Sequence, residues 1–226
     1  MKKLIRIIAL SLALVFVFGA CGNTEKPVTD GDEATSDTVQ SNKNSSVSGN
    51  TKVKFTMEDG SEFVIELHPE YAPQTVENFV KLVSEGFYDG LTFHRIVDGF
   101  MAQGGDPNGD GTGGSPDKIY GEFASNGYMD NKLSHTRGVV SMARKGDPQK
   151  AYTGYESSEY TNSASSQFFI CYADATFLDG DYAAFGVVTE GMEVVDSFLD
   201  VARTYGNDGA LSKPVTPIVI EKAEVI

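Results

Sequence analysis

The chain has 226 residues, of which 40% are hydrophobic and 11% aromatic, so it can bury the core of one domain and still carry extensions. Its formal net charge of −14 argues against nucleic-acid binding, which requires a basic surface, and against adhesion of the folded part to anionic lipids. Of its two cysteines, Cys171 closes the apolar run Phe168-Phe169-Ile170 and is expected to be a small buried hydrophobe, so no disulfide framework is predicted.

The N-terminus has the pattern of an export signal. A positively charged start precedes an apolar run from Ile7 to Ala20, and these 14 residues are too few to span a membrane as a helix. The run ends in Phe18-Gly19-Ala20-Cys21, which resembles the lipobox of bacterial lipoprotein precursors. The resemblance implies that residues 1–20 are a lipoprotein signal peptide and that a lipid on Cys21 anchors the chain to the cell membrane, on the extracytoplasmic side. An ordinary secretory signal with an incidental cysteine is the alternative.

Residues 21–50 are dominated after the cysteine by Ser, Thr, Asn, Asp and Gly, and they contain no aromatic residue. Such a stretch buries too little apolar surface to offset the entropy lost on ordering. We therefore predict a disordered linker over residues 21–50 and a folded domain over residues 51–226.

Eight segments of the folded part are predicted to be strands. Residues 52–57 and 63–67 alternate apolar and polar side chains on either side of Asp59-Gly60, which is a hairpin turn signal. The other six are Thr92–Ile96, Phe100–Gln103, Gly138–Ala143, Gln167–Tyr172, Ala184–Thr189 and Ile218–Ile226.

Two segments are predicted to be helices. Val76, Phe79, Val80 and Val83 recur at helical spacing after Pro73, which suits the first turn of a helix. The second helix is expected from Met192 to Val201. Many strands, two helices and long glycine-rich connections predict a β-barrel with helices packed on it.

Several blocks of the folded part, in this order along the chain, closely resemble the cyclophilin family. They are Val76-Glu77-Asn78-Phe79, Phe93 to Asp106, His135-Thr136-Arg137-Gly138, Ser166 to Ile170 and Phe177 to Gly186. The resemblance runs from about Val53 to the C-terminus and implies a mainly β fold, a closed eight-stranded antiparallel β-barrel capped by two α-helices. It also implies a peptidyl-prolyl cis/trans isomerase that acts on proline-containing polypeptides, assists the folding of exported proteins and needs no cofactor.

Strand alternation gathers one set of side chains on one face. Gln167 and Phe169 share a face of their strand, and so do Met101 and Gln103. The apolar members suit a proline ring, which is compact and has no N–H, while the amides can hold the flanking peptide group. Phe100, Phe177 and Leu178 are expected to complete the pocket.

The expected reaction needs neither a nucleophile nor a metal. Rotation about the peptide bond must break its resonance, and the prolyl nitrogen regains its lone pair in the twisted state. A donor aimed at that nitrogen binds the twisted state better than either planar state. The resemblance implies that Arg95 is this donor. It further implies a substrate site lined by Phe100, Met101, Gln103, Gly111, Ala143, Arg144, Gln167, Phe169, Phe177, Leu178 and Tyr182.

The sequence departs from the family's best-known eukaryotic members at several places. Phe177 and Tyr182 stand where those members have Trp and His, which should leave only weak binding of cyclosporin, a ligand of the family. Arg144 stands where they have Asn, whose backbone binds substrate. The stretch from Lys145 to Thr161 is longer than usual and is expected to add a wall beside the groove.

The sequence gives weaker support to other sites and functions. The set Asp106, Asn108, Asp110, Gly111 and Asp117 matches positions of a calcium-loop template, but position 12 is Asp rather than Glu and no helices flank the loop. No metal site is therefore expected, no zinc spacing appears among the histidines, and no Ser-His-Asp arrangement stands out. A module that binds proline segments without turnover is the alternative function. A solute receptor is disfavoured by the single small domain, and a monomer is expected.

Overall fold

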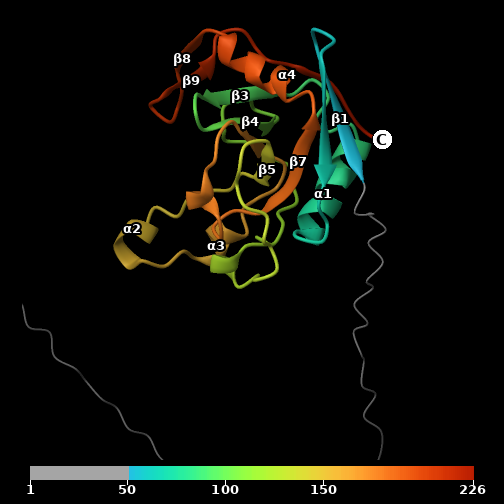
Figure 1. Ribbon diagram of the computed structural model, residues 1–226. Coiled ribbons are helices and arrows are strands. Elements are labelled where there is room, and N and C mark those ends of the chain that lie inside the picture. Colours follow the sequence, from blue (N-terminus) through green and yellow to red (C-terminus); the bar gives the residue numbers. More distant parts are fainter. Residues whose placement is uncertain (1–50) are drawn as a thin grey trace, which may run out of the picture. The chain divides into compact units, whose positions relative to one another are not determined.

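The computed structural model describes residues 51–226 (Figure 1). The predictions of a signal peptide (1–20), of lipidation at Cys21 and of a linker (21–50) lie outside these residues. Within the described part, no helix is long and apolar enough to cross a membrane.

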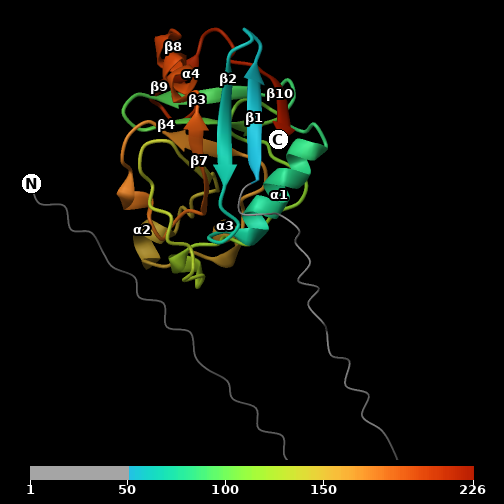
Figure 2. The ribbon, with the colours of Figure 1, turned by 45° about the vertical axis from the view of Figure 1, so that its right-hand side comes forward.

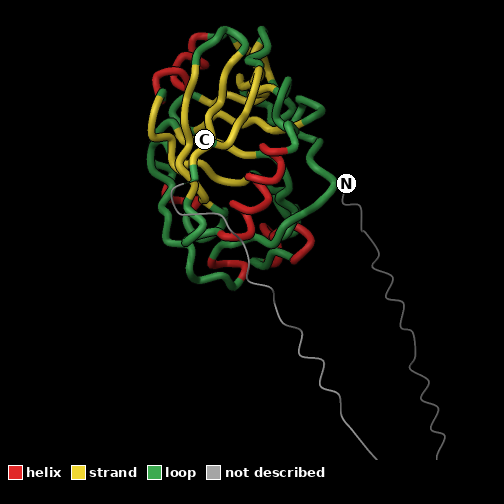
Figure 3. Tube along the Cα trace, turned by 90° about the vertical axis from the view of Figure 1, so that its right-hand side faces the viewer, coloured by secondary structure: helices red, strands yellow, loops and turns green. Residues whose placement is uncertain are grey.

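The described residues form a mainly β domain around one antiparallel sheet of eight strands. Its strand order is β10-β1-β2-β7-β5-β6-β4-β3, and Figure 3 shows how the sheet curls. The strands are β1 (Lys52–Met57), β2 (Glu62–Leu67), β3 (Thr92–Val97), β4 (Met101–Asp106), β5 (Val139–Met142), β6 (Phe168–Cys171), β7 (Ala184–Glu190) and β10 (Ile220–Val225). The sequence thus predicted every strand of this sheet, with ends shifted by a few residues.

The sheet is curled but open, so the expectation of a closed barrel was wrong. No ladder joins its edge strands β3 and β10. The bridge between Thr92 and Val219, the residue before β10, is isolated, and only a few backbone hydrogen bonds flank it, such as that from the Phe93 N–H to the Ile218 carbonyl at 2.9 Å. If pairing continued from this bridge along β3, the partners of β3 would be residues 214–218. Two of these are prolines, which have no N–H to donate to a ladder. Continued along β10, it would use residues 86–91, which form turns. Neither edge strand therefore finds a full partner.

The core lies between the concave face of the sheet and the helices. Phe55 of β1 stacks on Phe63 of β2 with ring centroids 4.9 Å apart, and Phe79 meets Phe168 edge to face at 5.5 Å. All four rings are fully buried. Phe79, Phe93 and Phe168 thus all belong to the main core.

Helix α1 (Pro73–Ser84) packs against β10 (Figure 2). It begins at the expected proline and buries Val76, Phe79 and Val83. A residue distant in the sequence caps its N-terminus. The buried carboxylate of Glu122 accepts hydrogen bonds from the backbone N–H groups of Gln74 (3.0 Å) and Thr75 (2.8 Å). These contacts satisfy donors that the helix itself leaves free.

Four α-helices, rather than the two expected, are present in residues 51–226. Helix α4 (Met192–Ser197) packs against β2 and continues as the 3-10 turn η3 (Phe198–Asp200). The others are the short helices α2 (Lys150–Thr153) and α3 (Ser158–Thr161), both inside the long stretch 145–161. Two further 3-10 turns are η1 (Ala124–Asn126) and η2 (Thr176–Leu178).

A two-stranded hairpin, β8 (Arg203–Tyr205) and β9 (Leu211–Pro214), was not predicted. Its strands are short and largely exposed, so they carry no run of alternating apolar residues. The hairpin packs beside β3, at the open edge of the large sheet.

Candidate active site

An apolar cavity of about 270 Å³ opens over the outer part of the sheet. It is lined by Arg95, Phe100, Met101, Gln103, Ala143, Arg144, Phe169, Leu178 and Tyr182. Nine of the twelve site residues expected from the sequence therefore surround one cavity. The strands β3, β4 and β6, which lie side by side at this edge, supply the residues at its centre.

Strand register explains why these side chains meet. Arg95 of β3 lies opposite Gln103 of β4, and Gln103 lies opposite Phe169 of β6. Residues that are direct cross-strand partners point to the same face of a sheet. A guanidinium, an amide and an aromatic ring thus form one row across three neighbouring strands.

The apolar wall is a small cluster separate from the main core. Met101, Phe169 and Leu178 are each at least nine-tenths buried and pack together. The ring of Tyr182 meets that of Phe169 edge to face at 5.9 Å. The wall is thus preformed, and its size and apolar character suit a compact ring such as that of proline.

Arg95 brings a permanent positive charge to this wall. Its Nη1 donates to the Gln103 side-chain oxygen at 3.4 Å and lies 3.6 Å from the Met101 sulfur. The side chain is 31% exposed, so it is neither buried nor free in solvent. The guanidinium therefore presents N–H groups toward the cavity from its edge.

The two glutamines form a hydrogen-bonded amide pair. Gln103 donates to the Gln167 side-chain oxygen at 2.8 Å, and Gln167 donates to the carbonyl of Gly113 at 2.7 Å. Gln167 also contacts the carbonyl of Gly111 at 3.2 Å. These bonds fasten the glycine-rich loop, residues 109–114, to Gln167, which directly precedes β6 and is itself bonded to Gln103 of β4.

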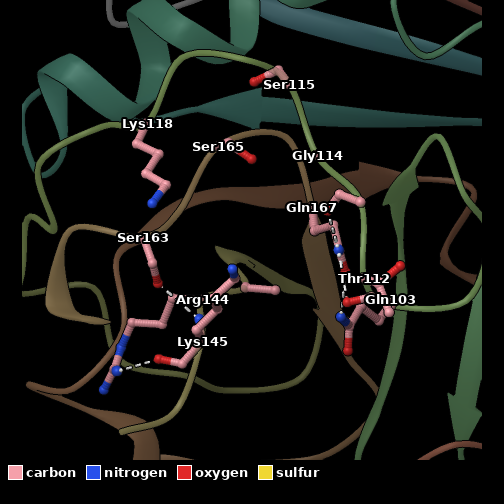
Figure 4. Close-up of a pocket in the computed structure, with 13 residues that line it drawn as sticks. Gln103, Thr112, Gly114, Ser115, Lys118, Arg144, Lys145, Ser163, Ser165 and Gln167 are labelled. Carbon is pink, nitrogen blue, oxygen red and sulfur yellow. Dashed lines mark hydrogen bonds between the residues drawn. The ribbon is translucent and has the colours of Figure 1, made fainter. Parts of the chain in front are cut away.

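A second, polar cavity of about 240 Å³ adjoins the apolar one and shares Gln103, Ala143 and Arg144 with it (Figure 4). In Figure 4 the two glutamines lie on one side and Lys118 and Ser163 on the other. Gln167 and Gly111, both expected at the site, line this polar cavity rather than the apolar one. The two adjoining cavities are together called the groove.

The structure places Phe177 differently from the expectation. Its side chain is 72% exposed and does not line the apolar cavity. Its ring lies 5.8 Å from that of Phe100, so it stands at the rim. The turn η2 buries Leu178 instead, because adjacent residues of a 3-10 turn point in different directions.

Arg144 is held away from solvent by groups on all sides. Its guanidinium lies over the rings of Tyr182 (4.7 Å) and Phe123 (5.1 Å), and its Nε donates to the carbonyl of Asp181 at 2.9 Å. Both carboxylate oxygens of Glu156, from the long 145–161 stretch, accept from its remaining nitrogens. The side chain thus supports one wall of the cavity.

A hydrogen-bonded Ser-His-Asp arrangement lies under the cavity, and sequence reasoning missed it. His135 bonds to Asp179 through Nδ1 (2.7 Å) and to the Ser141 hydroxyl through Nε2 (3.0 Å). Burial lowers the pKa of His135 more than Asp179 raises it, so the imidazole is neutral at pH 7. Because Ser141 is fully buried, it cannot attack a substrate, and the network instead backs the ring of Phe169, on which His135 stacks at 6.0 Å.

The calcium-like loop is a network of backbone bonds. The carboxylate of Asp106 accepts from the N–H groups of Asn108 (2.9 Å), Asp110 (3.1 Å) and Gly111 (2.6 Å). Asp117, at the twelfth position, pairs with Lys81 of α1 instead. Among residues 51–226, no group of three or more His, Cys, Asp or Glu side chains is arranged to hold a metal ion.

Comparisons with known proteins agree with this geometry. The family described as "Cyclophilin type peptidyl-prolyl cis-trans isomerase/CLD" matches residues 52–225. The chain is 43% identical over 139 residues to peptidyl-prolyl cis-trans isomerase B of Bacillus subtilis, covering 62% of this chain and 84% of that relative. It is 39% identical over 163 residues to the isomerase ppi1 of Schizosaccharomyces pombe, covering 72% and 91%.

Solved structures show the same fold. A Cryptosporidium parvum cyclophilin type peptidyl-prolyl cis-trans isomerase aligns with a TM-score of 0.63 and 28% identity, over 78% of this chain and 97% of that one. A second structure of that protein, in the presence of the dipeptide Ala-Pro, aligns with a TM-score of 0.62 and 27% identity. The chain therefore belongs to the cyclophilin type peptidyl-prolyl cis-trans isomerase family and is an isomerase enzyme of that type.

Proposed function

We propose that the chain speeds rotation about X-Pro bonds without covalent chemistry, with Arg95 as the donor to the twisted amide. The barrier to this rotation is roughly 18–20 kcal/mol, because the amide resonance must be broken. In the twisted state the lone pair of the prolyl nitrogen is localised on the nitrogen, whereas both planar forms delocalise it into the carbonyl. A fixed N–H donor beside that nitrogen lowers the barrier, because it binds the twisted state more strongly than the ground states.

The observation that carries the proposal is the position of Arg95 at the edge of the apolar cavity. A pyrrolidine ring seated against Met101 and Phe169 would place its nitrogen near the guanidinium, while the flanking peptide would run along Gln103. The similar Cryptosporidium parvum protein was solved in the presence of the dipeptide Ala-Pro, which is consistent with proline peptides as ligands of this groove. The next residues of the peptide would enter the polar cavity, whose serines, lysines and glycine carbonyls suit a peptide backbone.

We propose exported proteins as the substrates, with the enzyme held at the outer face of the membrane by a lipid on Cys21. The support is the signal-like start and the lipobox-like Phe18-Gly19-Ala20-Cys21 in the sequence. Globomycin, which blocks lipoprotein signal cleavage, should cause a precursor of larger apparent size to accumulate. A precursor that is processed equally with and without the drug would reject the anchor.

Cyclosporin binding is proposed to be weak. Tyr182 replaces a histidine of better-known members, and its ring is held by Phe169 and Arg144. The exposed Phe177 offers no indole N–H to a ligand at the rim. Inhibition of isomerase activity by submicromolar cyclosporin would contradict this.

The rival function is a module that holds proline segments without turning them over. The two are separated by stoichiometry in the refolding of a protein whose slow phase is proline isomerisation. An enzyme at one-hundredth of the substrate concentration should accelerate the slow phase. A holder would act only near equimolar amounts, and would slow refolding rather than speed it.

A further inference from the structure

Arg95 has a partner that lies far away in the sequence. Its Nε donates to Oδ2 of Asp208 at 2.7 Å, across a separation of 113 residues. Asp208 lies in the turn between β8 and β9, the hairpin that packs beside β3. The two side chains are 31% and 24% exposed, so the pair is partly shielded from solvent.

The carboxylate of Asp208 is itself held in place. Its other oxygen, Oδ1, accepts from the backbone N–H of Ala210 at 3.0 Å and from the hydroxyl of Ser212, which is almost fully buried, at 2.8 Å. Burial raises the pKa of Asp208, but the hydrogen bonds from Arg95, Ala210 and Ser212 together lower it by more. The pKa therefore lies below its ordinary value, and the carboxylate is charged at neutral pH. One oxygen is thus fixed to the hairpin and the other is left for the arginine.

The hairpin turn is fastened on a second side. Asn207 donates through its side-chain amide to the carbonyl of Asp110 at 3.1 Å, which ties the turn to the glycine-rich loop. The turn is also tight, because a Cβ added to Gly206 would lie 2.6 Å from the Ser212 hydroxyl. A carboxylate on such a turn is a fixed point rather than a mobile surface charge.

The ion pair with Asp208 leaves one nitrogen of the Arg95 guanidinium, Nη2, available to substrate. Nε is taken by Asp208, Nη1 faces Gln103 and Met101, and no group among residues 51–226 accepts a hydrogen bond from Nη2. Because the guanidinium is a rigid planar fork, fixing Nε and Nη1 also fixes the direction of Nη2. We propose that Asp208 is a positioning residue that holds Arg95 ready for the twisted amide, an inference that rests on the proposed role of Arg95.

The Asp208 carboxylate has two opposing effects on turnover, and the larger one decides whether its removal lowers or raises kcat. Pairing reduces the positive charge that Arg95 offers to substrate, but water screens this effect because both side chains are partly exposed. Without Asp208 the long arginine side chain samples several rotamers, and a donor that must be ordered during the reaction loses the advantage of preorganisation. Orientation is the larger effect, so removal of Asp208 lowers turnover.

The test compares Asp208→Ala with Asp200→Ala in the full chain. Asp200 is an exposed acid that makes no ion pair within the described residues, so it controls for the loss of one negative charge. Loss of the positioning partner should lower kcat about tenfold, the effect typical of groups that orient a functional side chain, with KM changed less than about twofold. Asp200→Ala should leave both constants unchanged.

A double variant shows whether Asp208 acts through Arg95. Arg95→Ala combined with Asp208→Ala should be no slower than Arg95→Ala alone, since an absent side chain cannot be misplaced. Ser212→Ala, which removes one bond from Asp208 but keeps the ion pair, should give a smaller loss and guards against misfolding of Asp208→Ala. Unchanged kcat in Asp208→Ala, or additive losses in the double variant, would overturn the inference. Full activity of Arg95→Ala would instead reject the proposed function.

Discussion

Arg144 and Glu156 form a two-pronged ion pair that joins the long 145–161 stretch to a wall of the apolar cavity. The two side chains are only 4% and 7% exposed, and the arginine also lies over the ring of Tyr182. The stretch that was predicted as an added wall is therefore fixed to the domain at a point that touches the candidate site.

Replacing Glu156 by Gln should destabilise the domain. The change leaves the buried Arg144 guanidinium without a countercharge, and breaking a buried pair at one partner typically costs about 3–5 kcal/mol. Urea titration followed by circular dichroism measures the free energy of unfolding. Glu159→Gln is the matched control, because Glu159 is exposed on the same stretch. Equal stability of the two variants would show that the pair contributes nothing.

Shortening the long stretch should change which peptides are preferred. Lys145, at its start, and Ser163, two residues after its end, line the polar cavity. The hydroxyl of Ser163 accepts from the N–H of Lys145 at 2.8 Å. Replacing residues 147–160 by a short glycine-serine linker removes the segment between these two ends, together with the exposed rings of Tyr152 and Tyr155. We expect the ranking of kcat/KM across a panel of X-Pro peptides to change. An unchanged ranking would mean that the stretch does not select substrates.

His94 should make the domain less stable in acid. It is buried, and neither ring nitrogen has a hydrogen-bond partner in the described part of the chain. Burial lowers its pKa from the ordinary value of 6.5, so the folded state binds fewer protons than the unfolded state. Its contribution to stability is therefore complete above pH 6.5 and is lost as the pH falls through 6.5 toward the lowered pKa.

His94→Leu tests this dependence. The variant should be as stable as the wild type or more stable at pH 8, because an unpaired buried imidazole is replaced by an apolar side chain. Between pH 7 and 5, the free energy of unfolding should fall less steeply for the variant than for the wild type. The two slopes should differ by up to about 1.4 kcal/mol per pH unit. Identical slopes for both proteins would show that His94 does not titrate in this range.

Cys171 should be chemically inert in the folded domain. It is fully buried, and burial raises the pKa of its thiol to about 12. In a Cys21→Ser background, iodoacetamide at pH 8 should fail to label the folded protein within an hour and should label it in urea. Rapid labelling without denaturant would contradict the buried position.

The strands and the core could be predicted because their signals are local. Val53, Phe55 and Met57 alternate, and these side chains are the buried face of β1. The same logic placed Gln103 and Phe169 on one face, and the register of β4 and β6 makes them direct partners. The other residues that line the cavity were predicted from the blocks of sequence that resemble the cyclophilin family.

What could not be predicted depends on contacts between distant segments. The open edge of the sheet is set by where residues 214–218 fall opposite β3, which no local pattern reveals. The Arg95–Asp208 pair and the bonds of His135 to Ser141 and Asp179 require the folded chain to bring these residues together. The prediction that Phe177 lines the cavity was wrong. Where two apolar residues are neighbours in a short turn, the sequence does not show which of them is buried.

The most direct measurement is NMR exchange spectroscopy on a proline peptide with wild type and Arg95→Ala, since the same spectra report both binding and cis/trans exchange. Loss of one preorganised donor typically lowers turnover about 100- to 1,000-fold, so we expect catalysed exchange to vanish while peptide shifts still report binding of similar strength. Arg95→Ala that exchanges the peptide as fast as the wild type would contradict the central role of the guanidinium.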